Sequence, residues 1–244
     1  MTANELRYNV LVGVDSLFGA TAPGYNNKQM SAVLNKAQRR VFGDYAKLFD
    51  QNEKIKRILA PLTKRASLLE GDVIPTVDTD ITNYPHATSD FIGTFYTLPA
   101  DLGRIVEEAL ILSIDNVNQE PSIVFPITYD YFLKNYRSRY KKPYVYQVWR
   151  MDAKLETVSA VERPVVELII DRDHDVEDYI VSYIKYPASL VVDTVNPFTN
   201  MTSCEIIDES FNEEIVGEAI KIITAALNDE GYQVTGMEKK FDEN

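Results

Sequence analysis

The sequence predicts an α+β protein that combines a helical domain with a mostly antiparallel β domain. Apolar residues recur at helical spacing near both ends of the chain. Between the ends they alternate with polar residues and are rich in β-branched and aromatic types. The order of helices, strands and helix is typical of α+β proteins. We expect residues 1–70 with 209–244 to form the helical domain, and residues 71–208 to form the β-rich domain with one inserted helix near 128–140.

Length and composition describe a globular protein. The chain has 244 residues, enough for one large domain or two small ones. Hydrophobic residues make up 45% and charged residues 25%, which excludes a wholly disordered chain. The single cysteine, Cys204, excludes an intramolecular disulfide. No apolar run approaches the roughly eighteen residues that span a membrane, and the N-terminus lacks the features of a secretory signal. We therefore expect no contact with a membrane.

The N-terminal region predicts three helices. Thr2 and Glu5 have the spacing of a capping box at the start of the first helix, which we expect to reach Gly19. Asn26 or Asn27 caps the second helix, and a shorter third helix ends at Pro61. The second helix has the most periodic apolar stripe in the sequence, composed of Met30, Val33, Leu34, Ala37, Val41, Tyr45, Leu48 and Phe49.

The central region predicts a long loop followed by strands. Proline, threonine and aspartate are frequent in residues 71–90, as in loops. Beyond this loop the apolar period changes to two. The expected strands are residues 93–98, 106–113, 144–150, 155–158, 165–171 and 179–186. Thr128 caps the helix that interrupts them.

The last helix begins at a second pattern of the capping-box type, formed by Ser210 and Glu213. We expect Gly231 to end this helix. The polar tail from Gly236 to Asn244 is then expected to gain order only from a neighbouring chain.

Charge is distributed unevenly along the chain. The net charge is −12, yet residues 28–65 contain ten Lys or Arg and three Asp or Glu, a local charge of +7. Residues 66–244 contain fourteen Lys or Arg and thirty-two Asp or Glu, a local charge of −18. A basic segment beside an acidic remainder predicts two surfaces that meet different partners.

The residues from Lys134 to Arg150 are the strongest candidate for a contact surface. They include six positive charges among several aromatic residues, and no acid lies between Asp130 and Asp152. Arginine beside aromatics suits base stacking and phosphate contacts, but tyrosine, tryptophan and arginine also dominate protein interfaces. On so acidic a protein we favour a contact with an acidic neighbour. The candidate contact residues are Lys134, Arg137, Arg139, Tyr140, Lys141, Lys142, Tyr144 and Trp149, together with Arg39 and Arg40 of the basic second helix.

No pattern in the sequence supports catalysis. Asp171, Asp173 and Asp175 alternate as in a calcium loop, but Val176 replaces the turn glycine and Ser182 the bidentate glutamate. A solvated hairpin turn is the preferred interpretation, although cation binding stays open. The paired acids and the two histidines, His86 and His174, lack the signature of a hydrolase or a nucleophilic site. We expect no enzyme activity and no cofactor, and a virion glycan hydrolase is the weakest alternative.

Four segments, in this order, resemble the head-to-tail adaptor proteins of tailed phages, including the tail tubular protein A type and the ring proteins of crAss-like phages. They are Leu34-Asn-Lys-Ala-Gln-Arg-Arg40, Phe95-Tyr-Thr-Leu-Pro-Ala-Asp-Leu-Gly-Arg104, Tyr183-Ile-Lys-Tyr-Pro-Ala-Ser-Leu190 and Asn212-Glu-Glu-Ile-Val-Gly-Glu-Ala219. The resemblance implies a structural ring of twelve copies in the neck or tail of a virion, assembled in the bacterial cytoplasm. Its partners would be the portal protein and further tail or ring proteins, and double-stranded DNA would pass through its channel. A soluble nucleic-acid-binding module is the alternative function.

Overall fold

The structure is a computed structural model of the chain. It describes residues 1–18, 24–68, 90–114, 117–118, 121–138, 140–158, 161–192, 203–206 and 208–241. For residues 114, 117–118, 153–158, 161–162 and 228–241 it describes the backbone alone. The expected loop at residues 71–90 lies outside the described residues except for Asp90.

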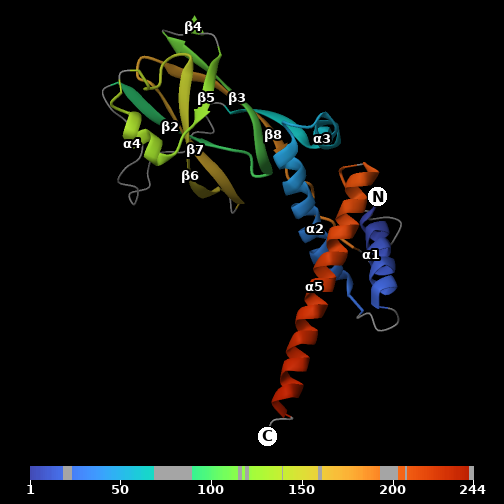
Figure 1. Cartoon of the computed structure of the whole chain (residues 1–244). Coiled ribbons are helices and arrows are strands. Elements are labelled where there is room, and N and C mark those ends of the chain that lie inside the picture. The colour runs from blue at the N-terminus through green and yellow to red at the C-terminus, as the bar shows by residue number, and fades with distance from the viewer. Residues whose placement is uncertain are drawn as a thin grey trace. The chain divides into compact units, whose positions relative to one another are not determined.

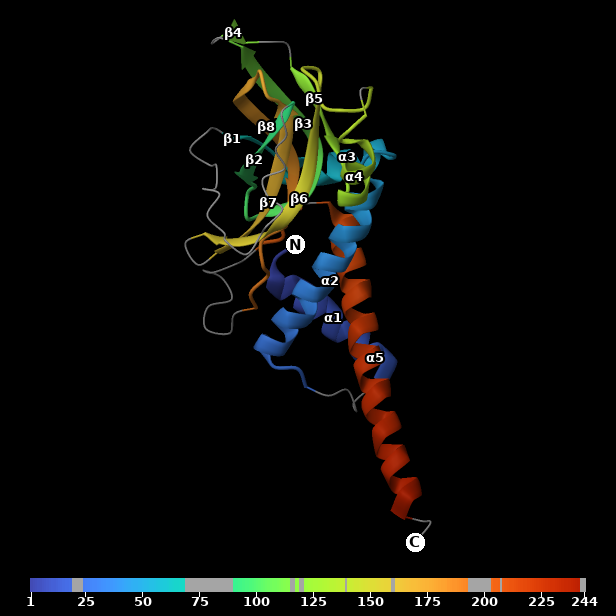
Figure 2. The same ribbon diagram turned by 90° about the vertical axis from the view of Figure 1, so that its left-hand side faces the viewer.

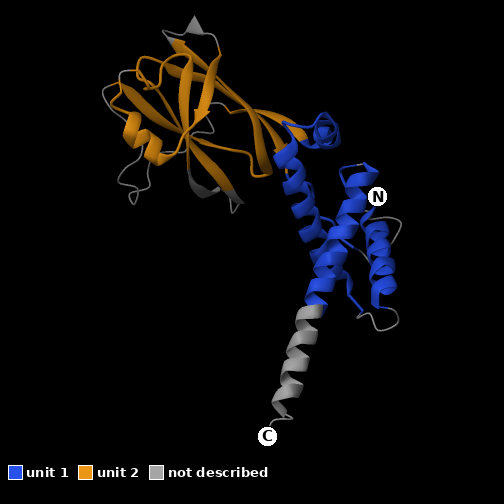
Figure 3. Cartoon of the chain, viewed as in Figure 1, with its two compact units in different colours: residues 1–62, 186–244 blue, residues 63–185 orange. Residues whose placement is uncertain are grey.

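The chain divides into two compact units (Figure 3). Unit 1 comprises residues 1–62 and 186–244, and unit 2 comprises residues 63–185. Unit 1 is helical and unit 2 is built on a mostly antiparallel sheet, so the predicted α+β class is confirmed. These boundaries differ from the expected ones at both ends of the β region. Residues 63–68 pair with a strand of unit 2, whereas the segment after Tyr186 packs on a helix of unit 1.

Unit 1 contains four α-helices and a short 3-10 helix among the described residues. They are α1 (Ala3–Phe18), α2 (Asn27–Leu48), α3 (Glu53–Leu59), η2 (Ala60–Leu62) and α5 (Glu209–Phe241). The predicted capping box of α1 is confirmed, because the Thr2 N–H donates to Glu5 Oε2 over 2.8 Å and the Glu5 N–H donates to Thr2 Oγ1 over 3.2 Å. Asn26 caps α2 in the same reciprocal way with Gln29.

Helix α5 runs alongside both α1 and α2 (Figures 1 and 2). Their shared core consists of Leu6, Val10, Val14, Leu34, Ala37, Val41, Phe211, Ile215, Ala219 and Ile223. The segment after Tyr186 is held on α2 by Asn35, whose Nδ2 donates to the Leu190 carbonyl and whose Oδ1 accepts from the Leu190 N–H, both over 2.8 Å. These paired bonds explain why this segment belongs to unit 1.

Three expectations for unit 1 were wrong. Asp208, rather than Ser210, caps α5, since its Oδ1 accepts from the Phe211 N–H over 3.2 Å. The helix continues past Gly231 to Phe241, because a glycine inside a helix lowers its stability without ending it. Leu48 is 45% exposed and does not belong to the buried stripe, although Ala46 and Phe49 beside it are buried.

Unit 2 is a single eight-stranded sheet with the strand order β1-β8-β3-β5-β6-β7-β2, in which β4 pairs with β3 off this path. The strands are β1 (Thr63–Leu68), β2 (Phe91–Thr97), β3 (Leu102–Ile114), β4 (Val117–Asn118), β5 (Ser122–Pro126), β6 (Gln147–Val158), β7 (Val161–Asp171) and β8 (Asp175–Lys185). All pairings are antiparallel except that of β5 with β6. The inserted helix is α4 (Tyr129–Asn135), capped by Thr128 as expected and shorter than the 128–140 range predicted for it.

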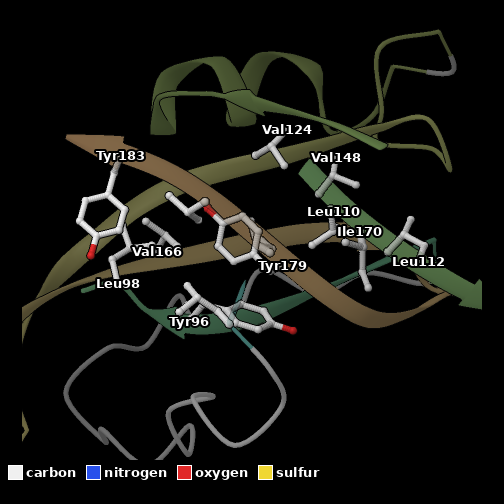
Figure 4. Packing of buried hydrophobic residues seen from close by; sticks show 13 residues of the cluster. Tyr96, Leu98, Leu110, Leu112, Val124, Val148, Val166, Ile170, Tyr179 and Tyr183 are labelled. Atoms are coloured by element: carbon white, nitrogen blue, oxygen red, sulfur yellow. The ribbon is translucent and has the colours of Figure 1, made fainter. Parts of the chain in front are cut away.

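Both faces of the sheet are covered. Leu68 of β1 and Tyr96 of β2 belong to one buried cluster although their strands stand at opposite ends of the strand order, so the sheet curls around this cluster. At its centre the Tyr96 and Tyr179 rings meet edge to face, with centroids 5.4 Å apart (Figure 4). The other face packs against α4 through a second cluster, composed of Phe91, Phe132, Trp149, Met151 and Ile169.

The sequence pattern missed β1, β4 and β5, and it divided β6 into two strands. Strand β1 has one buried side chain, Leu68, because it forms an edge of the sheet. In β5 the pattern is inverted, since Ser122 is buried whereas Ile123 is 70% exposed. Within the described residues, no helix has the length and apolarity that crossing a membrane would need.

Candidate functional site

The region from Lys134 to Arg150 begins on α4, whose inner side holds it on the sheet. The Phe132 ring packs edge to face on Trp149 of β6, with centroids 6.3 Å apart. The outer side of the helix presents Tyr129, Leu133 and Lys134 to solvent, and both apolar side chains are more than two-fifths exposed. The last turn of α4 therefore carries an apolar and a basic side chain next to each other.

Trp149 does not belong to the surface on which the sequence placed it. Its side chain is fully buried between the sheet and α4, where Tyr131 and Phe132 both make edge-to-face ring contacts with it. The prediction that Trp149 is a contact residue was wrong because α4 covers the face of β6 from which this side chain points. Arg139 lies outside the described residues.

The other candidate residues of unit 2 are exposed or partly exposed. Tyr140 is 94% exposed and Tyr144 is 48% exposed. The Arg137 guanidinium stands 5.1 Å from the centroid of the Tyr136 ring, in cation–π geometry. Lys142 donates to Asp90 over 2.8 Å, so its charge is already paired, whereas Lys134 and Lys141 extend into solvent.

The same region also has an apolar part that was not predicted from the sequence. On β5, Ile123 and Phe125 are 70% and 41% exposed, while Val124 between them is buried. The Ile123 N–H donates to the Tyr146 carbonyl over 3.0 Å, and the Phe125 ring lies 6.1 Å from the Tyr131 ring of α4. We call the exposed large apolar and aromatic residues of β5, of α4 and of the segment just before β6 the β5–α4 surface: Ile123, Phe125, Tyr129, Leu133, Tyr144 and Tyr146.

Arg150 is the end of the basic sequence segment but lies inside unit 2. Its Nη1 donates to Glu108 Oε2 over 2.6 Å, and the Tyr179 hydroxyl donates to the other oxygen of the same carboxylate. Burial acts to lower the pKa of Arg150, but the Glu108 charge outweighs this effect, and the pKa is raised. Burial and the same carboxylate raise the pKa of Tyr179. Arg150 is thus a structural ion-pair residue and contributes no charge to a contact surface.

In unit 1 the basic candidates lie along one side of α2. We call Lys36, Arg39, Arg40, Gly43 and Lys47 the α2 ridge, because they recur three or four residues apart and all but Gly43 are exposed. Arg40 pairs with Glu218 of α5 over 2.8 Å, and Lys47 pairs with Asp44 over 3.1 Å. The described residues place no carboxylate within ion-pair distance of Lys36 or Arg39.

Two grooves flank the α2 ridge, and Arg39 and Arg40 line both. The larger groove, of about 860 Å³, lies between α2 and α5. Its α2 side carries Arg39, Arg40 and Lys47, and its α5 side carries Glu213, Glu214 and Glu218. The smaller groove, of about 460 Å³, lies between α2 and the segment that contains Ser189.

Comparison with known proteins identifies the family. The family model of phage tail ring protein 3/4 matches residues 1–233. The chain belongs to this family of phage tail ring proteins. The ring protein 4/5 of Bacteroides phage crAss001 is 26% identical to it over 243 residues, which is 93% of each chain. The resemblance inferred from the four sequence segments is therefore confirmed, and the phage tail ring protein is a structural component of the virion.

The remaining polar candidates of this phage tail ring protein are the β7–β8 turn, Cys204 and the two histidines. Asp171 ends β7 and Asp175 begins β8, and the Asp171 carboxylate accepts from the Asp173 N–H over 3.2 Å within the hairpin turn. Across the described ranges, no group of three or more His, Cys, Asp or Glu side chains is arranged to hold a metal ion. Cys204 is buried in unit 1, and burial raises the pKa of its thiol, which disfavours the reactive thiolate. His86 lies outside the described residues.

Proposed function

We propose that this ring protein joins the portal to the tail, in a ring of twelve copies that encloses the channel through which double-stranded DNA passes. The observation that carries the proposal is the family match, which spans residues 1–233 and so includes both units. We infer that the subunit is assembled in the cytoplasm of the bacterial host, acts mechanically and carries out no reaction.

The charge distribution supports the channel. The chain has a net charge of −12, and its acids are concentrated in residues 66–244. A channel wall with excess carboxylates repels the phosphate backbone over about a Debye length, roughly 8 Å at physiological salt. Such a wall keeps passing DNA from binding to it.

The β5–α4 surface, with Lys134, Arg137, Tyr140 and Lys141 beside it, is the proposed contact with a neighbouring ring protein or another copy. Exposed aromatic and branched side chains rimmed by positive charge are typical of protein interfaces. The nucleic-acid alternative loses support here, because Trp149 is buried, the Arg150 side chain is only 12% exposed and is paired with Glu108, and Lys142 is already paired with Asp90. The surface therefore lacks the tryptophan that could stack on bases and two of the cations that could contact phosphates.

Mass photometry of the purified chain, alone and mixed with the portal protein, tests the function. Closed rings are expected at least in the mixture, since a portal ring supplies a template. The variant Ile123→Ser with Tyr140→Ser should unfold at the parent temperature, because both side chains are mostly exposed, and should form fewer rings. Val191→Ser, at an exposed apolar residue of unit 1, is the matched control and should form rings like the parent. A chain that stays monomeric with the portal and every other tail protein would overturn the proposal.

A further inference from the structure

The outward side of α1 is apolar at its centre and acidic around it. Leu6, Val10 and Val14 are buried, whereas Tyr8 and Val12 are 67% and 50% exposed on the opposite side of the helix. Tyr8 and Val12 are one helical turn apart. We call Glu5, Tyr8, Val12 and Asp15 the α1 outer face, since their spacing of three or four residues aligns them on one side.

The α2 ridge of unit 1 has the opposite charge. It carries four cations, of which Arg40 is paired with Glu218 and Lys47 with Asp44. At its middle, Gly43 leaves the helix backbone bare, and a β-carbon built there would have no atom within 4 Å. Gly217 on the opposing side of the α2–α5 groove is equally open. The groove beside the ridge therefore lets a neighbouring side chain approach the backbone of both helices.

We infer that the α1 outer face of one copy docks on the α2 ridge of the next copy. Asp15 would meet Arg39, which with Lys36 is one of the two ridge cations for which the described part of the chain provides no carboxylate. The exposed Tyr8 and Val12 would lie over Gly43 on the α2 side of the groove, away from Glu213, Glu214 and Glu218 on its α5 side. This contact rests on the proposed ring function and specifies how copies join.

Charge also determines the symmetry of the contact. Two α1 outer faces would bring four carboxylates together, and two α2 ridges would bring together the Lys36 and Arg39 charges of both copies, for which the described residues provide no carboxylate, so neither face pairs with itself. A contact between two different faces is head-to-tail, and head-to-tail contacts close into rings when the rotation between subunits allows it. The pairing of an acidic face with a basic ridge therefore favours a ring over a two-fold dimer.

Disulfide trapping tests this contact on the full chain. The only native cysteine, Cys204, is buried, so engineered thiols dominate the chemistry. Val12→Cys and Gly43→Cys chains, mixed in equal amounts under mild oxidation, should form a mixed dimer in preference to either homodimer. Gly24→Cys is the matched control, because Gly24 is exposed with no atom within 4 Å of an added β-carbon and lies outside the groove. Mixing Val12→Cys with Gly24→Cys should give only the background yield.

Charge reversal gives a second, independent readout. Adding Lys36→Glu and Arg39→Glu to the Gly43→Cys chain should slow formation of the mixed dimer by about tenfold or more, since like charges would then face each other across the interface. Adding Asp15→Lys to the Val12→Cys partner should restore part of the rate. Yields no higher than the Gly24→Cys control, or a rate unchanged by the reversal, would overturn the inferred contact. If rings form with the portal but never contain the disulfide between Val12→Cys and Gly43→Cys, the inferred contact is wrong and the proposed function is unaffected.

Discussion

Gly13 of α1 lies directly against Ile220 of α5, and a β-carbon at position 13 would stand 2.3 Å from Ile220 Cδ1 and 3.2 Å from Cγ1. Both distances are shorter than ordinary carbon–carbon contacts. The glycine therefore permits the close packing of α1 on α5, because a larger residue at position 13 would require the Ile220 side chain to move.

Gly13→Val is expected to lower the free energy of unfolding by about 1–3 kcal/mol, because it overpacks this contact. Urea unfolding followed by far-UV circular dichroism measures the loss. Gly217→Val is the control, since position 217 is open, and should change stability by less than about 0.5 kcal/mol. Equal effects of the two substitutions would show that α1 does not pack closely on α5 at Gly13.

Gly43→Ala and Gly217→Ala should each stabilise the free subunit. Both glycines are inside helices, where glycine costs roughly 0.5–1 kcal/mol relative to alanine, and neither has an atom within 4 Å of an added β-carbon. The midpoint of unfolding should therefore rise for each variant. A fall in the midpoint would mean that part of the subunit fills the groove in solution.

Arg150→Met should destabilise unit 2 by about 3–5 kcal/mol, because it leaves the buried Glu108 carboxylate without its cation. Thermal unfolding of the variant measures this loss. Combining it with Glu108→Gln removes the uncompensated charge and retains a group that can accept from the Tyr179 hydroxyl. The double variant should therefore be more stable than Arg150→Met alone. If it is not, the charge of Glu108 is compensated from elsewhere.

The lowered pKa of the Asp101 carboxyl predicts that the protein loses stability as the pH falls into the acid range. Partial burial acts to raise the pKa of its carboxyl, but the bonds from Lys64 and Tyr183 outweigh this effect and hold the pKa below 3.8. A lowered pKa stabilises the folded protein above the unfolded pKa, and this stabilisation is lost as the pH falls through the folded value. Asp101→Asn should lower the free energy of unfolding by only about 0.5–1 kcal/mol at neutral pH, since the Asp101 side chain is 40% exposed and solvent screens its charge. The difference from the parent should shrink below about pH 4.

The control for this prediction is Asp173→Asn, at an exposed residue of the β7–β8 turn. The free energy of unfolding of this variant, measured in urea, should differ from that of the parent by the same amount across the pH range. If the difference in free energy of unfolding between Asp101→Asn and the parent were also independent of pH, the bonds from Lys64 and Tyr183 would not favour the ionised carboxyl.

The sequence was sufficient to predict the helices of unit 1 and the long strands of unit 2, because their buried faces follow the helical or strand period. It failed where a residue's surroundings come from distant parts of the chain. Strand β1 has a single buried residue, and β5 exposes Ile123 while it buries Ser122, so neither shows the expected alternation. The predicted end of α5 at Gly231 was wrong, because a glycine lowers the stability of a helix without ending it.

The candidate contact residues were predicted less completely, for a related reason. The sequence shows that this segment is basic and aromatic. It does not show which of these side chains are covered by a helix packed on the sheet. Trp149 and Arg150 are neighbours in the sequence, yet one packs under α4 and the other pairs with Glu108. The exposed apolar residues of β5 could have been found only from the reversed alternation of Ser122, Ile123, Val124 and Phe125.

Reversing charge beside the β5–α4 surface separates a protein contact from a nucleic-acid site. Arg137→Glu with Lys141→Glu should leave the subunit folded, because both side chains are exposed and surface substitutions change stability by less than about 0.5 kcal/mol. We expect the variant to join rings poorly, since like charges across an interface cost several kcal/mol. Its affinity for duplex DNA, measured by fluorescence anisotropy at low salt, should stay as weak as that of the parent. Tight parental binding that falls steeply with salt would show engaged phosphates, and its loss in a variant that still forms rings would make this surface a DNA-binding site.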